Sequence, residues 1–173
     1  AVPKRVMATG QKNWLKSQGL NVDDSIQCMV EWKMENGKKF NQTLLTNWVD
    51  PKSTSAMSDQ KLKIVGTKGR IELDQKKRGI QIIVDGNTLE EPNPDFCQPY
   101  GTTDNKTRWQ GYGIESIVTF LKDVDNIINS GKTPSSLEGK RPTFMEAMIS
   151  TAVIETASIS LADNGTWKLV SLP

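Results

Sequence analysis

Apolar and polar residues alternate along the first part of the chain. From Ile26 to Met34 every second residue is apolar, and the alternation resumes after "ENG" in "KKFNQTLLTNW". Period-two alternation is typical of a β-strand that buries one face. Shorter stretches of the same kind are "PKRVMATGQ", "KLKIV", "RIELD" and "GIQIIVDG". The pattern therefore predicts a meander of antiparallel strands.

The register of the hairpin around "ENG" can be argued from the same pattern. A two-residue turn at Asn36-Gly37 would place Trp32 opposite Asn41. A three-residue loop over Glu35–Gly37 places Trp32 opposite Phe40 and keeps the apolar residues on one face. We prefer the second register, with the glycine in the left-handed conformation beside a bulge.

Two helices are predicted in the last third of the chain. Apolar residues recur at helical spacing from Ile114 to Ile128, and Gly131 and Pro134 stop this helix. A second helix begins at Thr143, which forms a capping-box pattern with Glu146, and ends at Asn164-Gly165. Between strands and helices, residues 87–110 are Pro-rich and polar and are interpreted as a long loop, whereas "TWKLVSL" predicts a last short strand.

Strands followed by two helices and a final strand predict an α+β fold. We expect one domain over residues 1–173, with an open, mostly antiparallel β-sheet and two main helices packed on one face. The other face of the sheet would then carry a mixed set of side chains, namely Asn41, Thr43, Leu45, Asn47 and Val49.

The motif "IVGTKGRIEL" raises the question of a phosphate-binding loop. A Walker loop needs four residues between its glycines, and a Rossmann turn needs three glycines followed by a helix. Here two residues separate Gly66 from Gly69, and the next segment has a strand pattern. We therefore expect a hairpin turn that joins 62–65 to 70–73.

Composition narrows the chemistry. The chain contains no His, which excludes His-based acid–base pairs and His metal ligands, and Cys28 and Cys97 are expected to be free thiols. The net charge of +2 is scattered, so no nucleic-acid partner is indicated. No apolar run approaches the roughly 20 residues of a membrane span, and no export leader precedes the first strand. These observations favour a cytoplasmic protein with no membrane partner.

Taken together, four segments resemble the C-terminal domain of the Gfo/Idh/MocA oxidoreductases, the family of glucose–fructose oxidoreductase and inositol dehydrogenase. They are "DSIQCMVEWKMENGKKFNQTLLTNWVDP", "SDQKLKIVGTKGRIELDQKKRG", "GYGIESIVTFLKDV" and "RPTFMEAMISTAVIETASISL". The resemblance covers nearly the whole chain. It implies that the chain, which starts at Ala1 without an initiator Met, is a piece of a longer protein.

The resemblance implies that the two domains of the parent protein have different roles. Family members bind NAD or NADP in an N-terminal Rossmann domain, and their C-terminal open-sheet domain covers the active site and mediates oligomerisation. The family's Gly-rich fingerprint, its Glu-Lys-Pro segment and its Asp-x-x-x-His helix are all absent from this sequence. We therefore expect no catalytic residue, no cofactor-binding residue and no metal site in this chain, and an NAD or NADP cofactor in the full-length parent.

Some residues could still line a substrate pocket. Asn47 and Trp48 follow a strand end, where Trp48 could stack on a sugar ring and Asn47 could bridge hydroxyls. Packing of Trp48 in the core or in a dimer contact is the alternative.

Four further candidates lie in turns and at a helix start. Asp59 and Lys61 precede a strand, Arg78 lies in the turn "QKKR", and Tyr112 comes just before a helix. Each has an alternative structural role: Asp59 and Lys61 as solvated loop residues, Arg78 in an exposed turn, and Tyr112 as a staple at the helix start.

The functional hypothesis is the substrate-side and assembly domain of an NAD(P)-dependent sugar or polyol oxidoreductase, inactive on its own. The alternative is a stand-alone α+β module that binds a carbohydrate or a protein without catalysis. The resemblance and the mixed sheet face both favour a homo-oligomer that pairs through the open sheet. A monomer whose open face is covered by residues 87–110 is the alternative.

Overall fold

The computed structural model describes residues 1–50, 59–75, 79–84, 86, 97–101 and 107–172. Contacts within the chain define two compact units, one formed by residues 1–52 with 137–173 and the other by residues 53–136. The expectation of a single domain over 1–173 stays a prediction.

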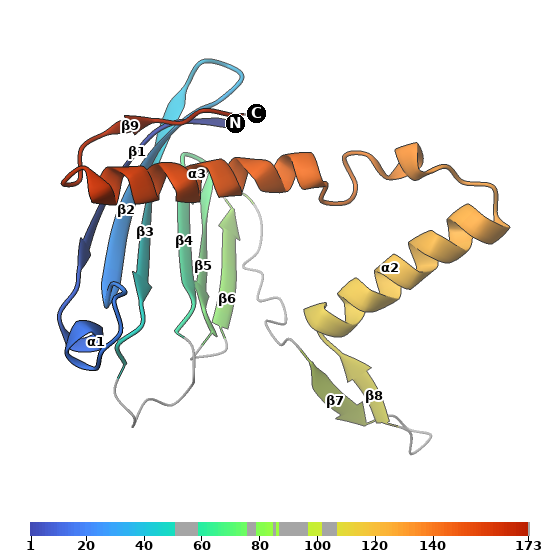
Figure 1. The fold of residues 1–173 in the computed structure, drawn as a ribbon. Coiled ribbons are helices and arrows are strands. Elements are labelled where there is room, and N and C mark those ends of the chain that lie inside the picture. The colour runs from blue at the N-terminus through green and yellow to red at the C-terminus, as the bar shows by residue number, and fades with distance from the viewer. Residues whose placement is uncertain (51–58, 76–78, 85, 87–96, 102–106, 173) are drawn as a thin grey trace. The chain divides into compact units, whose positions relative to one another are not determined.

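The first unit is built on a four-stranded antiparallel sheet with the order β3-β2-β1-β9 (Figure 1). Its strands are β1 (Val2–Gln11), β2 (Ser25–Lys33), β3 (Lys39–Asn47) and the short β9 (Lys168–Leu169). The long helix α3 (Phe144–Ala162) packs against β1 and β9. A one-turn helix, α1 (Trp14–Ser17), follows β1.

The core of this unit lies between α3 and the centre of the sheet. Val6 and Val30 are fully buried and oppose each other across β1 and β2, and they pack with Ala8, Cys28 and Val153. Alternation explains why these residues share a face, since successive side chains of a strand point to opposite sides. Residues next to them in sequence therefore lie on the side of the sheet away from α3.

The β2–β3 hairpin has the register that the hydrophobic pattern predicts. Trp32 pairs with Phe40, and their rings stack with centroids 5.8 Å apart. The backbone N–H of Met34 donates to the carbonyl of Lys38 at 2.7 Å, which leaves three residues in the loop. Gly37 closes the loop with a φ of 81°. The prediction of a three-residue loop with a left-handed glycine is confirmed.

Both ends of α3 follow the sequence signals. Thr143 accepts a hydrogen bond from the Glu146 backbone N–H, and the Glu146 carboxylate accepts one from the Thr143 backbone N–H, so the capping box is present. At the other end Asn164 has a φ of 54°, and the Gly165 N–H donates to the Ser160 carbonyl at 2.8 Å. This is the Schellman pattern that commonly ends a helix at a left-handed residue.

By length and apolar composition alone, α3 is the described helix that could cross a membrane. Its buried residues are Ala152, Val153, Thr156 and Ser160, and Val153 belongs to the core beneath it. The helix thus presents small and apolar residues to the sheet. Packing on the sheet accounts for only part of this composition, because other apolar side chains of α3, such as Phe144, Met145 and Ile154, are exposed.

The second unit contains two separate antiparallel sheets and a helix. One sheet has the order β4-β5-β6, formed by β4 (Lys61–Gly66), β5 (Gly69–Asp74) and β6 (Gly79–Val84). The other is a hairpin of β7 (Gln98–Gly101) and β8 (Thr107–Gln110), which α2 (Tyr112–Asn129) follows. A short 3-10 turn, η2 (Pro134–Leu137), lies between α2 and α3.

The α+β fold class with mostly antiparallel, open sheets and a few helices is confirmed. The strands of the described residues are divided among three sheets. The interpretation of residues 87–110 as one long loop is wrong for its last part, because β7 and β8 pair there from Gln98↔Gln110 to Gly101↔Thr107. Pro99 and the isolated aromatic residues made this hairpin hard to predict. Proline is tolerated in an edge strand, but it weakens the sequence pattern that predicts a strand.

Candidate functional site

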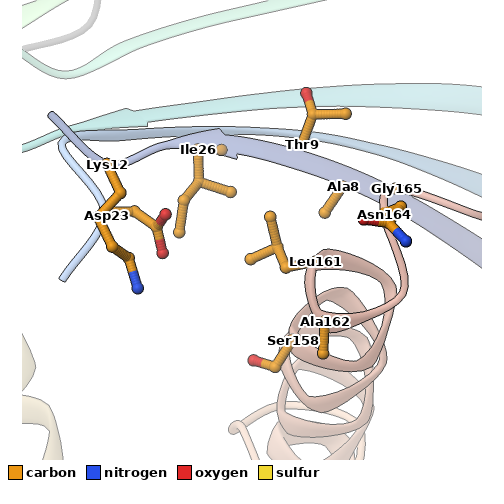
Figure 2. Close-up of a pocket in the computed structure, with 11 residues that line it drawn as sticks. Ala8, Thr9, Lys12, Asp23, Ile26, Ser158, Leu161, Ala162, Asn164 and Gly165 are labelled. Atoms are coloured by element: carbon orange, nitrogen blue, oxygen red, sulfur yellow. The ribbon is translucent and has the colours of Figure 1, made fainter. Parts of the chain in front are cut away.

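A hollow of about 710 Å³ opens between the end of β1, the start of β2 and the C-terminal end of α3 (Figure 2). Lys12 and Asp23 lie at its sheet end, while Ser158 and Leu161 of α3 form the helix side. Ile26 lies in the wall between them. The described residues that line the hollow all belong to the first unit.

The segment that carries Lys12 and Asp23 is fixed by the neighbouring Asp24. The Asp24 carboxylate accepts three backbone N–H bonds, from Asn13 at 2.8 Å and from Trp14 and Leu15 at 2.7 Å each. These bonds satisfy the free N–H groups at the start of α1. They also hold the pKa of the Asp24 carboxyl below its ordinary value, with the Leu15 N–H as the largest cause, against the opposing effect of desolvation.

The helix side is fixed by Ser160, which is fully buried. Its Oγ accepts from the Ala8 backbone N–H at 2.9 Å and donates to the Thr166 carbonyl at 2.7 Å. One side chain thus ties α3 to β1 and to the turn that leads into β9. The walls of the hollow are therefore held by buried polar contacts on both sides.

The polar groups in the hollow differ in how they are bonded. The carboxylate of Asp23 is half-buried and forms no hydrogen bond or ion pair with the described residues. Lys12 Nζ lies 3.5 Å from Asn21 Oδ1. Ser158 Oγ donates to the Ile154 carbonyl at 3.1 Å. The hollow can hold a small molecule with polar groups at one end and carbon along Ile26 and Leu161.

Nucleophilic catalysis by a residue such as Ser would need a second group in the lining. A serine hydroxyl is activated by a base within hydrogen-bonding distance. The described lining of the hollow contains no such pair. Among the described residues, no group of three or more Cys, Asp and Glu side chains could hold a metal ion.

Two of the candidate pocket residues predicted from the sequence, Asn47 and Trp48, lie at the end of β3. The side chain of Asn47 makes a local turn, in which Nδ2 donates to the Val49 carbonyl at 2.7 Å and Oδ1 accepts from the Val49 N–H at 3.2 Å. Trp48 is 79% exposed, and its backbone N–H donates to the Asp24 carbonyl at 2.9 Å. Trp48 therefore does not pack in the core of its unit, and its indole ring is available at the surface.

The other predicted residues belong to the second unit. Lys61 Nζ lies 3.6 Å from Asp59 Oδ2 and 3.8 Å from Asp74 Oδ2, so two of the predicted residues pair with each other. Tyr112 is the first residue of α2 and is exposed. Arg78 lies outside the described residues.

Sequence reasoning did not single out Lys12, Asp23, Asp24 or Ser160. The pair Asp23-Asp24 before β2 was a usable signal for Asp24, because an Asp close to a short helix can accept its free N–H groups. Ser160 resembled the other small residues of α3, and its role depends on Ala8, which is far from it in sequence. No local pattern could have identified that contact.

The "GTKG" motif is a hairpin turn, as predicted. Gly66 and Gly69 pair with each other across β4 and β5. A Cβ atom on Gly69 would lie 2.4 Å from the Ile83 carbonyl oxygen, so this glycine is needed for close approach of β6. A dinucleotide phosphate needs backbone N–H groups at a helix N-terminus, whereas a strand follows here. The residues of this motif do not fit a dinucleotide.

Comparison with solved structures shows the fold. An oxidoreductase from Sinorhizobium meliloti matches with a TM-score of 0.65 and 16% sequence identity, over 96% of this chain and 46% of its own. A protein from Thermotoga maritima to which oxidoreductase activity is ascribed matches with a TM-score of 0.60 and 18% identity, over 97% of this chain and 41% of its own. The chain thus spans less than half the length of either protein. No family model and no curated protein matches the sequence.

Proposed function

We propose that the chain is the substrate-side domain of an NAD(P)-dependent oxidoreductase of the Gfo/Idh/MocA type that acts on a sugar or polyol. One observation carries the proposal: two oxidoreductases contain this fold over nearly all of the chain, yet the chain spans only 46% and 41% of them. The unmatched part of such a protein has room for a cofactor-binding domain. The order of the resembling segments supports the same family.

In this proposal the nicotinamide cofactor is bound by the rest of the parent protein. The cofactor would supply the hydride acceptor or donor. The "GTKG" turn does not fit the cofactor phosphates, because the backbone of Ile83 already lies against Gly69. The contribution of this chain is then to shape the pocket and to exclude water from it.

Of the predicted pocket residues, Trp48 is best suited to contact a sugar. Its indole is exposed, and an aromatic face binds the C–H face of a sugar ring by dispersion. Asn47 beside it already uses its amide in the turn to Val49, so its role is to position Trp48. Asp59, Lys61, Arg78 and Tyr112 remain candidates of the same proposal.

The proposal includes a homo-oligomer formed through the open sheet. The face of the four-stranded sheet away from α3 carries Asn41, Thr43 and Leu45, because their β2 partners lie opposite the buried set. Leu45 is 68% exposed, and Met29 adds further apolar surface. A two-fold pairing of this face would bury both residues.

The decisive experiment uses the protein encoded by the complete reading frame. Reduction of NAD or NADP by a panel of sugars and polyols is expected for that protein, and Trp48→Ala is expected to raise KM more than it lowers kcat. The 173-residue chain alone is expected to give no nicotinamide reduction. A complete reading frame that begins near Ala1, together with carbohydrate binding by the chain alone, would favour the stand-alone module instead.

A further inference from the structure

We propose that the hollow beside α3 binds an organic ammonium ion, meaning a small primary amine, through the carboxylate of Asp23. The proposal concerns binding by this chain alone and does not rest on hydride transfer. Two neighbouring carboxylates differ in their hydrogen bonds. Asp24 accepts three backbone N–H bonds, whereas Asp23 faces the hollow without a bonded partner among the described residues.

A half-buried carboxylate gains most from a cation that also donates hydrogen bonds. The other groups around the hollow point to the same ligand chemistry. The C-terminal end of α3 lies at the hollow, and this end of a helix carries partial negative charge. Ser158 already donates its hydroxyl hydrogen to Ile154, so its oxygen offers only acceptor positions.

The remaining walls suit the carbon part of an amine. Ile26 and Leu161 present aliphatic side chains on opposite sides of the hollow (Figure 2). A short alkyl chain would lie between them while its ammonium group reaches Asp23. Burial of this chain strengthens binding by about fourfold at most for each methylene group. Weak, millimolar affinity is therefore expected for the smallest amines.

Among the described residues that line the hollow, Lys12 is the one with a cationic side chain, and its removal tests the charge of the ligand. It forms no ion pair with Asp23, and its Nζ lies 3.5 Å from Asn21 Oδ1 instead. A bound ammonium ion would be repelled by Lys12, whereas an anion or the oxygen of an alcohol would be attracted. Removal of this charge must therefore strengthen the binding of an amine and weaken that of the other two.

Gly10 provides a steric test at the same place. A Cβ atom built on Gly10 would lie 3.0 Å from Asp23 Oδ1 and 3.3 Å from Leu161 Cδ2. Both contacts are to ends of side chains, which can shift at little cost. Gly10→Ala should leave the fold intact while it displaces the carboxylate and narrows the hollow.

The experiment titrates the full chain with n-butylammonium chloride and follows backbone amide shifts by NMR. Asp23→Asn is expected to weaken binding at least about tenfold, since a charge-assisted bond is lost. Lys12→Met is expected to strengthen it about twofold to threefold at low salt. Gly10→Ala should weaken it, and shifts in the wild type should centre on residues around Asp23 and Leu161.

Matched controls remove charges elsewhere in the same unit. Glu155→Gln and Lys16→Met change exposed residues that do not line the hollow, and neither should alter the affinity. Circular dichroism confirms that each variant is folded. If Asp23→Asn does not fold, the other two variants test the proposal. Amine binding must then be stronger in Lys12→Met and weaker in Gly10→Ala.

Three results would overturn the proposal. They are unchanged amine binding in Asp23→Asn, weaker amine binding in Lys12→Met, and equal or tighter binding of n-butanol or butyrate than of n-butylammonium. Nicotinamide reduction by the parent protein is unaffected by any of these results, so the two proposals fail separately.

Discussion

The hydroxyl of Ser160 accepts a hydrogen bond from the backbone N–H of Ala8 at 2.9 Å, across 152 positions of sequence. Strand β9 pairs only with Arg5 and Val6 of β1. The N–H of Ala8 therefore lies beyond the end of β9, and a side chain of α3 takes the place of a strand partner. Both residues are buried. Helix and sheet are thus joined by a polar contact inside an otherwise apolar core.

Ser160→Ala is expected to lower the free energy of unfolding by about 1–3 kcal/mol, because the buried Ala8 N–H would lose its acceptor. The Thr166 carbonyl would lose its donor as well. Urea unfolding monitored by circular dichroism measures the change. Ser158→Ala is the control, since Ser158 is exposed on the same helix and bonds only to Ile154. A loss of stability no greater than that of the control would refute the role given to Ser160.

The Asp24 carboxylate is expected to make stability depend on pH in the acid range. Its pKa is lowered in the folded chain, first by the Leu15 N–H, so the unfolded chain binds the proton more tightly. The stabilisation is complete above the unfolded pKa of about 4 and is lost as the pH falls through the lower folded pKa. The difference in unfolding free energy between wild type and Asp24→Asn should therefore be constant near neutral pH and shrink below pH of about 4. A difference that stays constant down to the acid transition would contradict this assignment.

Local patterns in the sequence determined much of this fold. The Trp32–Phe40 register followed from alternation, and the capping box of Thr143 and Glu146 from residue type and spacing. Contacts that join distant segments could not be predicted in this way. Ser160 with Ala8 is such a contact, and the hollow beside Asp23 exists only because α3 ends next to β1. Sequence analysis therefore selected Asn47 and Asp59, whose polar groups are used in local bonds, and missed Asp23, which has no bonded partner among the described residues.

Gly69 and Gly66 form a matched pair for testing the turn. A Cβ on Gly69 would lie 2.4 Å from the Ile83 oxygen, whereas a Cβ on Gly66 would have its nearest neighbour, the Gly69 oxygen, at 3.6 Å. Gly69→Ala is expected to destabilise the β5–β6 pairing by about 1–3 kcal/mol through forced displacement of backbone. Gly66→Ala should be neutral or slightly stabilising. Hydrogen exchange of the amides of Ile82 and Val84 measures the difference, and equal effects of the two substitutions would exclude this explanation.

The isolated chain is expected to bind neither NAD nor NADP. The reason is the turn between β4 and β5, which leads into a strand and provides no helix N-terminus for the pyrophosphate. Isothermal titration calorimetry with each dinucleotide tests this directly. Micromolar affinity for either one would reopen the phosphate-loop interpretation of "GTKG". The complete parent protein serves as the positive control.

The last prediction concerns the open face of the four-stranded sheet. If two copies pair through this face, Leu45→Glu places two carboxylates in the contact and should shift the assembly to monomers of 19.2 kDa. Ile154→Glu is the control, because Ile154 is equally exposed but lies on α3, which packs on the opposite face. Light scattering at several protein concentrations measures the mass of both variants. The same face also carries Glu31, which bonds to Lys39 and Arg5 within one copy of the sheet. Because these charges are already paired inside each copy, we expect the association to depend more on Leu45 than on the salt concentration. Wild-type protein that stays at 19.2 kDa at every concentration would exclude the pairing.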